Sequence, residues 1–520
     1  MTEFLQSIGY NGWVLHAIVL LPLIGMVPVL LAPEASAKRI AFVVTTLVFV
    51  ISAGLWWSLD QASGQLQLVS NMAWIPAWGI AYRVGIDGIS LFMVLLSTAL
   101  MPLAVLGSWK YIEERERGYY ALLLALETGL LGVFIALDLF VFYVFFEVML
   151  IPMYFLIGIW GGANRMYAAI KFFVYTFFGS LLMLVAIIAM VWQVAKATGT
   201  LSFAYEHLLS NATHVQDIAP WLFGAFALAF AIKVPIFPLH TWLPDAHVEA
   251  PTAGSVLLAS VMLKIGTYGF LRFAVPFFPE VAFSSAVTNL MVGLAVIGII
   301  YGALVAMVQP DIKKLVAYSS VSHLGFVMLG IWAATLQSVQ GALMVMIAHG
   351  LSTGALFFLI GMMYERRHTR EIAAYGGVAR VMPLLTVIFV VVSLSSIGLP
   401  GLNGFIGEFL VLLGSFPVYP WATGIATIVV IFAAAYLLWA VQRLFYGKIE
   451  RPENASLTDL TGRELAVLLP LLFGIIWMGV YPAPVLRRME SAARAYVELA
   501  QPRGAVPNAA IGAAIVETRP

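Results

Sequence analysis

The chain of 520 residues contains no cysteine and few charged residues. Without cysteine, disulfides, Cys-ligated zinc, Cys-ligated iron–sulfur clusters and thiol catalysis are excluded within this chain. Charged residues make up only 10% of it and hydrophobic residues 62%, whereas soluble domains have about 25% and roughly 45–50%. The mean hydropathy of +0.97 is too high for a soluble core, because even large domains leave much of their surface exposed. Composition therefore indicates a polytopic membrane protein.

Net charge is also nearly absent, since 27 Lys and Arg residues face 26 Asp and Glu residues for a total of +1. A nucleic-acid partner would require a basic surface, so this balance argues against one. Three catalytic motifs are missing as well: H-E-x-x-H, G-x-S-x-G and G-x-x-x-x-G-K-[ST]. These absences leave a function inside the lipid bilayer as the favoured interpretation.

Fourteen apolar stretches are long enough to cross the bilayer as helices, which takes about 20 residues each. The sequence therefore predicts an all-α polytopic fold. The N-terminus, Met1-Thr2-Glu3, lacks a basic segment and is not expected to be a cleaved signal. The predicted spans lie near 13–32, 39–57, 88–109, 119–137, 139–161, 168–194, 219–240, 251–275, 287–308, 312–333, 338–363, 383–416 (one interrupted segment), 421–444 and 463–482.

Orientation follows from the basic residues in the loops, because cytoplasmic loops are rich in Lys and Arg. The loops of one side carry sixteen, and those of the other only Arg83, Lys196 and Arg272. The first side is predicted to be cytoplasmic, so both termini are predicted to be periplasmic. The predicted periplasmic C-terminal tail is an exception to this rule, because it carries five basic residues: Arg487, Arg488, Arg494, Arg503 and Arg519. The sixteen are Lys38, Arg39, Lys110, Arg115, Arg117, Arg165, Lys313, Lys314, Arg366, Arg367, Arg370, Arg380, Arg443, Lys448, Arg451 and Arg463.

Seven ionisable residues fall deep inside the predicted spans, although each charge there costs about 2.5–3.5 kcal/mol on insertion scales. At 1.5 Å per residue, several of them lie about 12–20 Å from their helix ends, near the bilayer centre. A single buried histidine is more often a packing residue, and a single lysine can be half of a structural ion pair. The shared depth of the whole set instead predicts a lateral row bridged by water. The set is Glu127, Glu147, Lys233, Lys264, His323, His349 and Glu408.

Several other polar residues have plainer interpretations. Lys171 is expected to extend toward the lipid headgroups, and Asp138 to cap a helix. His16 is assigned to packing, and the loop residues His207 and His214 to solvent. Glu127 is the least certain member of the buried set, because the sequence offers it no partner.

Two of the spans are interrupted by proline, which removes a backbone donor and breaks a helix. Pro235 and Pro238 break the seventh span just after Lys233, and Pro400-Gly401 breaks the twelfth before Glu408. Interruptions at matching places predict two inverted five-helix repeats with an ion path at their interface. Simple kinks are the alternative. The predicted division is 1–111 for three N-terminal helices, 112–280 and 281–450 for the two repeats, and 451–520 for the last helix and tail.

The buried residues can support proton transfer. Glu147 could hold Lys233 charged, and separation of the pair would release the lysine's proton. We expect a relay from Lys233 through Lys264 and the His323/His349 region to Glu408, with exit at the outer face. His240 and His247 lie seven residues apart near the cytoplasmic surface, and with Asp245 or Glu249 they could bind a metal. Capping and packing of the broken helix is the favoured interpretation.

Several segments resemble the antiporter-like membrane subunits of respiratory complex I. These are His240-Thr241-Trp242-Leu243-Pro244-Asp245-Ala246-His247 with Ala250-Pro251-Thr252, the Lys233-x-Pro235 break, and Gly398-Leu399-Pro400-Gly401-x-x-Gly404-Phe405. The family's fifth-helix Glu, seventh-helix Lys and eighth-helix Lys match Glu147, Lys233 and Lys264, and its central histidines match His323 and His349. The chain stops about 40 residues after its last span, which is short for the L type. Glu408 stands where the L and N types carry lysine, as in the M type (chain 4).

The resemblance implies one proton channel of a proton-translocating NADH:quinone oxidoreductase in the bacterial inner membrane. It places NADH, flavin mononucleotide (FMN), iron–sulfur and quinone chemistry in other subunits and no cofactor in this chain. The implied partners are the lipid bilayer and the L-type and N-type subunits. A cation/proton antiporter module of the Mrp or membrane-hydrogenase type, and an inert membrane scaffold, remain as alternatives.

Overall fold

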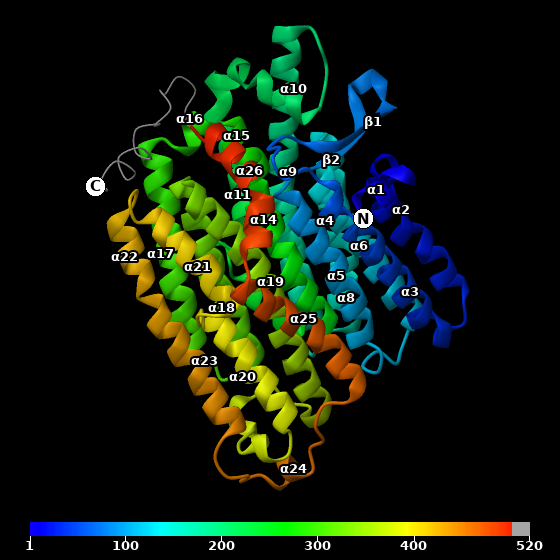
Figure 1. Cartoon of the computed structure of the whole chain (residues 1–520), viewed down its shortest axis with the longest axis vertical. Helices are drawn as coiled ribbons and strands as arrows, with labels where there is room; N and C mark the ends of the chain where they lie inside the picture. The colour runs from blue at the N-terminus through cyan, green and yellow to red at the C-terminus, as the bar shows by residue number, and fades with distance from the viewer. Residues whose placement is uncertain (502–520) are drawn as a thin grey trace.

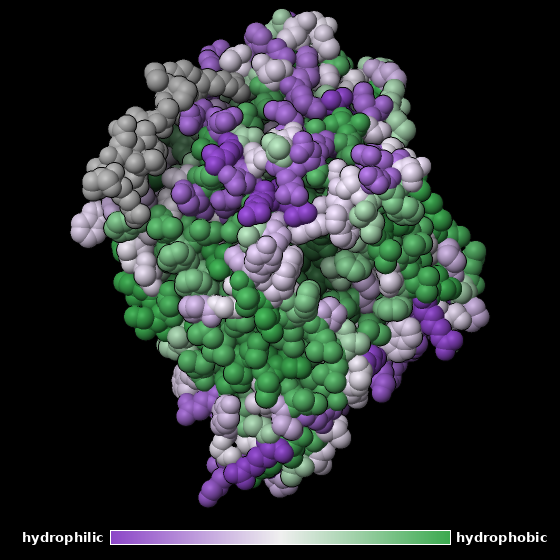
Figure 2. All heavy atoms as spheres, viewed as in Figure 1, coloured by the Kyte–Doolittle hydropathy of each residue, from purple (hydrophilic) through white to green (hydrophobic). Residues whose placement is uncertain are grey.

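The computed structural model describes residues 1–501 and confirms an all-α polytopic architecture. In this part of the chain, 13 helices are long and apolar enough to cross a membrane. Two shorter apolar helices, Pro383–Ile397 and Asn403–Ser415, form the interrupted twelfth span. Figure 2 shows a hydrophobic band across the middle of the face in view, with hydrophilic residues gathered toward the two ends of the molecule.

The N-terminal half contains the first eight spans and the first break. Its helices are α1 (Thr2–Ser7), α2 (Tyr10–Leu31), α3 (Glu34–Ala53), α4 (Leu55–Ser58), α5 (Ser90–Gly107), α6 (Glu116–Ile135), α7 (Leu139–Val148), α8 (Leu150–Trp160), α9 (Arg165–Thr198), α10 (Tyr205–Ser210), η2 (Ala212–Ile218), α11 (Ala219–Lys233), α12 (Trp242–Glu249), α13 (Thr252–Leu257), η3 (Leu258–Met262), α14 (Leu263–Gly269), η4 (Phe270–Ala274) and α15 (Val275–Phe277).

The C-terminal half contains the remaining six spans and the second break. Its helices are α16 (Pro279–Ala282), α17 (Ser285–Met307), α18 (Ile312–Ala333), α19 (Leu336–Arg367), η5 (Ile372–Ala374), η6 (Val378–Arg380), α20 (Pro383–Ile397), α21 (Asn403–Ser415), α22 (Pro420–Thr427), α23 (Val429–Phe445), α24 (Pro452–Ala455), α25 (Gly462–Val480) and α26 (Ala483–Leu499).

The core lies around the eighth, tenth and eleventh spans. The most apolar stretch of the eighth span, Thr252–Phe277, is entirely buried, and α18 and α19 are almost as enclosed. The outer helices α2 and α3 bury only about a third of their most apolar stretch within the protein, as membrane-facing helices do because lipid can solvate their side chains. Lys264, His323 and His349 therefore belong to the three most enclosed spans.

Two elements of the structure are absent from the sequence prediction. One is an antiparallel hairpin of β1 (Gln67–Ile75) and β2 (Ile80–Ile86), joined by η1 (Pro76–Trp78), in which Asn71 pairs with Arg83. The hairpin projects beside α10 at the end of the molecule opposite α24 (Figure 1). Hydropathy misses it because both strands are too short to cross a membrane, although β2, unlike the largely exposed β1, has no exposed residue.

The other is α26, an amphipathic helix that follows the last span. Its buried residues recur at helical spacing: Val485, Met489, Ala492, Ala493 and Tyr496. This helix, red in Figure 1, runs across the front of the bundle and packs against α19 and α15. It is too polar to cross a membrane, so a search for apolar runs passes over it. The predicted C-terminal tail lies outside the described residues from 502 onward.

Candidate functional site

Four of the six predicted site residues form two contacting pairs at the centre of the bundle. Lys264 Nζ lies 2.6 Å from His349 Nδ1, and His323 Nδ1 lies 2.8 Å from Glu408 Oε1. The rings of His323 and His349 are 5.7 Å apart between centroids. All four side chains are buried, and they come from α14, α19, α18 and α21. The structure thus brings together residues that lie 85 positions apart in each pair.

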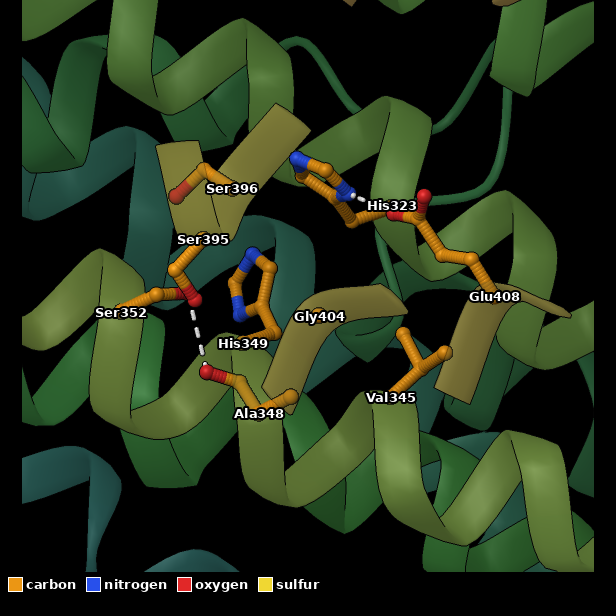
Figure 3. A pocket seen from close by; sticks show the side chains of 9 residues that line it. All are labelled: His323, Val345, Ala348, His349, Ser352, Ser395, Ser396, Gly404 and Glu408. Atoms are coloured by element: carbon orange, nitrogen blue, oxygen red, sulfur yellow. Dashed lines mark hydrogen bonds and ion pairs between the residues drawn. The ribbon is translucent and has the colours of Figure 1, made fainter. Parts of the chain in front are cut away.

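The two pairs meet at a small polar cavity. It is lined by both histidines, Glu408 and the hydroxyl residues Ser352, Ser395 and Ser396 (Figure 3). Its volume is about 10 Å³, close to the space that one water molecule needs. The Nε2 atoms of His323 and His349 make no hydrogen bond to described residues. Each histidine therefore contacts a charged partner through Nδ1 and has a second ring nitrogen free.

Lys264 is held by an unusual stretch of helix. Two π-helical segments, η3 and η4, lie on either side of α14, and such wide turns frequently mark functional sites. The Lys264 ammonium also donates to the carbonyl of Ala259 within η3. The lysine is thereby fixed by backbone on one side and by His349 on the other. Periodicity in the sequence does not reveal these wide turns.

Glu408 is positioned by the second break, as predicted. Helix α20 ends at Ile397, α21 begins at Asn403, and Glu408 lies in the second turn of α21. Gly398 and Gly401 adopt positive φ angles of 83° and 93°, which only glycine adopts readily. The Ser395 hydroxyl bonds Asn403 Oδ1 at 2.6 Å across the break. The interruption is therefore a defined turn, held by a hydrogen bond, that places the Glu408 carboxylate against His323.

Lys233 and Glu147 are not paired in this structure. Lys233 is the last residue of α11, as predicted, and is buried. Its ammonium has no hydrogen-bond partner among the described residues and lies 5.1 Å from the centre of the Phe146 ring. Glu147 is half-buried and close enough for its charge to act on Lys233. Glu147 is therefore near Lys233, as expected, but makes no ion pair with it here, and no hydrogen bond joins Lys233 to Lys264.

Three predictions about single basic residues need correction. Lys171 pairs with Asp245 at 2.7 Å instead of extending toward headgroups. Arg272, assigned to a loop, lies buried in η4 and forms an ion pair with Asp87 at 2.6 Å. Lys313, also assigned to a loop, is buried and donates to the carbonyl of Ala250 at 2.7 Å. In each case the partner is remote in sequence, and only Arg272 and Lys313 are buried.

The Asp87–Arg272 pair is the main feature that the sequence analysis missed. A signal was available, because Arg272 falls within the predicted eighth span and lies eight residues after Lys264. The partner Asp87 is 185 positions away and could not be found from spacing.

The remaining polar residues divide between partnered and unpartnered groups. Asp138 caps α7 through the amides of Phe140 and Val141, as predicted. His16 does more than pack, since its Nε2 atom lies 3.0 Å from the Ser70 hydroxyl. Glu127 is fully buried, and neither carboxylate oxygen has a hydrogen-bond partner within residues 1–501.

The two surface-predicted histidines and the two near the first break differ in their environments. His214 is exposed, whereas His207 is partly buried. The ring of His247 stacks on Phe357 at 4.8 Å, and that of His240 lies 5.1 Å from Tyr301. Within the described ranges, no group of three His, Cys, Asp or Glu residues is arranged to hold a metal ion.

The fold and the buried row together define an antiporter-like ion-translocating membrane protein. The family described as NADH:quinone oxidoreductase/Mrp antiporter, TM matches residues 136–434. The family described as NADH-ubiquinone oxidoreductase chain 4, amino terminus, matches residues 17–133. The two matches cover consecutive parts of the chain and agree with each other.

Individual relatives show to which group within this family of membrane proteins the chain belongs. The chain is 47% identical to NADH-quinone oxidoreductase subunit M of Rhodobacter capsulatus, over 87% of this chain and 89% of the relative. It resembles a chain of respiratory complex I from Thermus thermophilus with bound NADH, at a TM-score of 0.85 and 35% identity, covering 94% of this chain and all of that one. A chain of the Mrp complex from Dietzia shares only the fold, at a TM-score of 0.77 and 22% identity, over 92% of this chain and 52% of that one. The chain belongs to the subunit M (chain 4) family of NADH-quinone oxidoreductase.

Proposed function

We propose that this chain carries protons across the membrane as a subunit of NADH-quinone oxidoreductase, through the row Lys264, His349, His323 and Glu408. The observation that carries the proposal is the buried sequence of donor and acceptor contacts around one water-sized cavity. Its members are groups that can each take up and release a proton. Burial between helices keeps the row away from lipid.

The geometry supports a stepwise transfer. The Lys264 ammonium passes a proton to His349 Nδ1, and His349 releases one from Nε2 to water in the cavity. That water passes a proton to His323 Nε2, and His323 releases one from Nδ1 to Glu408. Each histidine accepts on one nitrogen and donates from the other, so the proton balance is kept at every step.

Lys233 and Glu147 are proposed to load this row. Their charges interact without a direct ion pair, which corresponds to the separated state of the predicted pair. In that state the lysine has lost most of its counter-charge and gives up its proton more easily. Closure of the pair would recharge it.

The setting of the subunit follows from its family. We propose a place in a bacterial inner membrane, with the loops rich in Lys and Arg in the cytoplasm and both termini in the periplasm. The L-type and N-type subunits are the proposed neighbours, and NADH, FMN, iron–sulfur clusters and quinone are proposed to act in other subunits. The division into two inverted repeats, 112–280 and 281–450, remains a prediction.

The test uses the assembled complex in proteoliposomes. Lys264→Met and Glu408→Gln should each slow proton flux through this row by about 100-fold, the usual contribution of a positioned proton-transfer group, so that fewer protons are pumped per NADH oxidised. NADH oxidation in the presence of an uncoupler should continue. Lys448→Met and Glu450→Gln, which change exposed residues of one loop, are the matched controls. Unchanged stoichiometry in both site variants would overturn the proposal.

A further inference from the structure

A second buried charge pair lies on the same helix as Lys264 but outside the proposed row. Arg272 Nη2 is 2.6 Å from Asp87 Oδ2, and the two residues are only 7% and 3% exposed. Arg272 belongs to η4, whereas Asp87 lies three residues before the first residue of α5. The pair lies at the end of the eighth span that faces away from the loops rich in Lys and Arg, which we name the basic-poor face.

Asp87 is held firmly in its charged form. Its Oδ1 atom accepts hydrogen bonds from the backbone amides of Ile89 and Ser90, both at 3.0 Å. Burial by itself would raise the pKa of Asp87, but the Arg272 guanidinium and these amides hold it below its usual value. Neither partner therefore exchanges protons readily: Asp87 stays ionised, and the Arg272 guanidinium stays protonated, as guanidinium groups do in proteins.

Water can reach this pair from the basic-poor face. A cavity of about 300 Å³ is lined by Asp87, Arg272, Tyr205 and Glu206, together with Ala492 and Tyr496 of α26. That volume is many times the roughly 10–15 Å³ that one water molecule requires. The buried pair therefore lines a cavity with room for many water molecules, which we name the vestibule.

On its inner side the pair is separated from Lys264 by about two turns of the same helix. Lys264, Tyr268 and Arg272 follow one another at four-residue spacing, which places them on one helix face. The buried Tyr268 hydroxyl accepts from Arg272 Nε at 3.3 Å and donates to the carbonyl of Phe134 at 3.1 Å. Only this tyrosine stands between Lys264 and the pair along the helix face.

We infer that the Asp87–Arg272 pair is a proton-tight seal that keeps protons of the vestibule from reaching Lys264. A proton wire needs members that both accept and donate, whereas a guanidinium only donates. The wire therefore ends at Arg272, and the Tyr268 hydroxyl is already committed to the Phe134 carbonyl. A fixed cation in a narrow path also repels incoming protons. The inference rests on the proposed function, because a seal matters only if Lys264 exchanges protons.

The test measures passive proton leak in proteoliposomes that contain the whole complex, with an imposed pH difference and no NADH. Arg272→Ser removes the permanent donor and leaves room for water, so the pH difference should decay roughly ten-fold faster than with the unchanged complex. Arg272→Lys keeps a cation beside Asp87 but one that can release its proton, so its leak should lie between those of Arg272→Ser and the unchanged complex. Arg83→Ser is the matched control, since Arg83 pairs with Glu206 at the same face but is partly exposed.

A second variant identifies the path of the leak. Adding Lys264→Met to Arg272→Ser should return the leak to the unchanged rate, because the seal guards that lysine. Arg272→Gln, closer to arginine in size, serves as the opening variant if Arg272→Ser does not assemble. An assembled opening variant without increased leak would overturn the seal, and so would a leak that persists in the double variant. Failure of the proposed relay is a separate result, since it appears as undiminished NADH-driven pumping in Lys264→Met alone.

Discussion

Two buried carboxyl groups in this chain have opposite surroundings. Glu408 contacts His323 at 2.8 Å, whereas both oxygens of Glu127 lack a hydrogen-bond partner in the described part of the chain. An unsatisfied buried polar group costs about 1–3 kcal/mol. The contrast separates a residue placed for proton transfer from one that the site does not use.

We therefore expect Glu127→Gln to pump the normal number of protons per NADH. Glu127→Leu should also raise the thermal midpoint of the complex, because it removes a buried polar group that has lost its water without gaining a partner. Proton stoichiometry and thermal unfolding of the purified complex check the two expectations. Glu408→Gln, which breaks a made contact, provides the comparison. A loss of pumping in Glu127→Gln would place Glu127 on the proton path.

At the scale of the elements, the two broken helices deliver their ionisable residues differently. The first ends a helix at Lys233, which leaves the lysine at the last turn of α11. The second forms a tight turn with two left-handed glycines and places Glu408 shortly after it. A carboxylate near a helix N-terminus and an ammonium near a C-terminus each lie at the favourable end of the helix dipole.

The turn before α21 offers a matched pair of substitutions. Gly398→Ala and Gly401→Ala both place a side chain at positive φ, with a similar cost of about 1–2 kcal/mol. A β-carbon at Gly398 would lie 3.1 Å from Glu408 Oε2, whereas one at Gly401 meets nothing within 4 Å. We expect Gly398→Ala to slow proton pumping clearly more than Gly401→Ala does. Equal pumping rates in the two variants would show that the turn does not set the position of Glu408.

At the scale of the whole molecule, α26 ties distant parts of the bundle together. Arg488 of this helix donates to the carbonyl of Trp56 at 3.2 Å and lies 3.8 Å from the centre of its ring. The Tyr496 hydroxyl bonds the carbonyl of Ile331 at 3.3 Å. The helix thus joins the N-terminal spans to the core and forms one wall of the vestibule.

Loss of the Arg488–Trp56 contact should weaken the assembled chain. An arginine over a tryptophan ring contributes about 0.5–2 kcal/mol, so Arg488→Met and Trp56→Leu should each lower the thermal midpoint of the complex. The double variant should lower it by less than the sum of the two, because both remove the same contact. Arg487→Met, at the exposed neighbouring position, should leave the midpoint unchanged. Strictly additive shifts would show that the contact contributes nothing.

Hydropathy and proline placement were sufficient to predict the spans and both breaks. The cost of placing a residue in a bilayer is a local property of the chain, so apolar runs and the buried charges among them are visible in one dimension. Counting along helices also placed Lys264, His323, His349 and Glu147 at a common depth. The motifs around Pro235 and Pro400 were enough to indicate the family.

Contacts between helices were decided only by the tertiary structure. The partners Lys264 and His349 are 85 positions apart, and Asp87 and Arg272 are 185 apart; depth along a helix says nothing about which neighbour its side chain faces. For the same reason, the sequence could place Glu147 and Lys233 near each other in depth but could not say whether the two side chains are in contact. A search for long apolar runs does not find the hairpin, whose strands are short, or α26, which is too polar. Both segments pack against the rest of the protein. Packing geometry, which depends on all helices at once, chooses these partners.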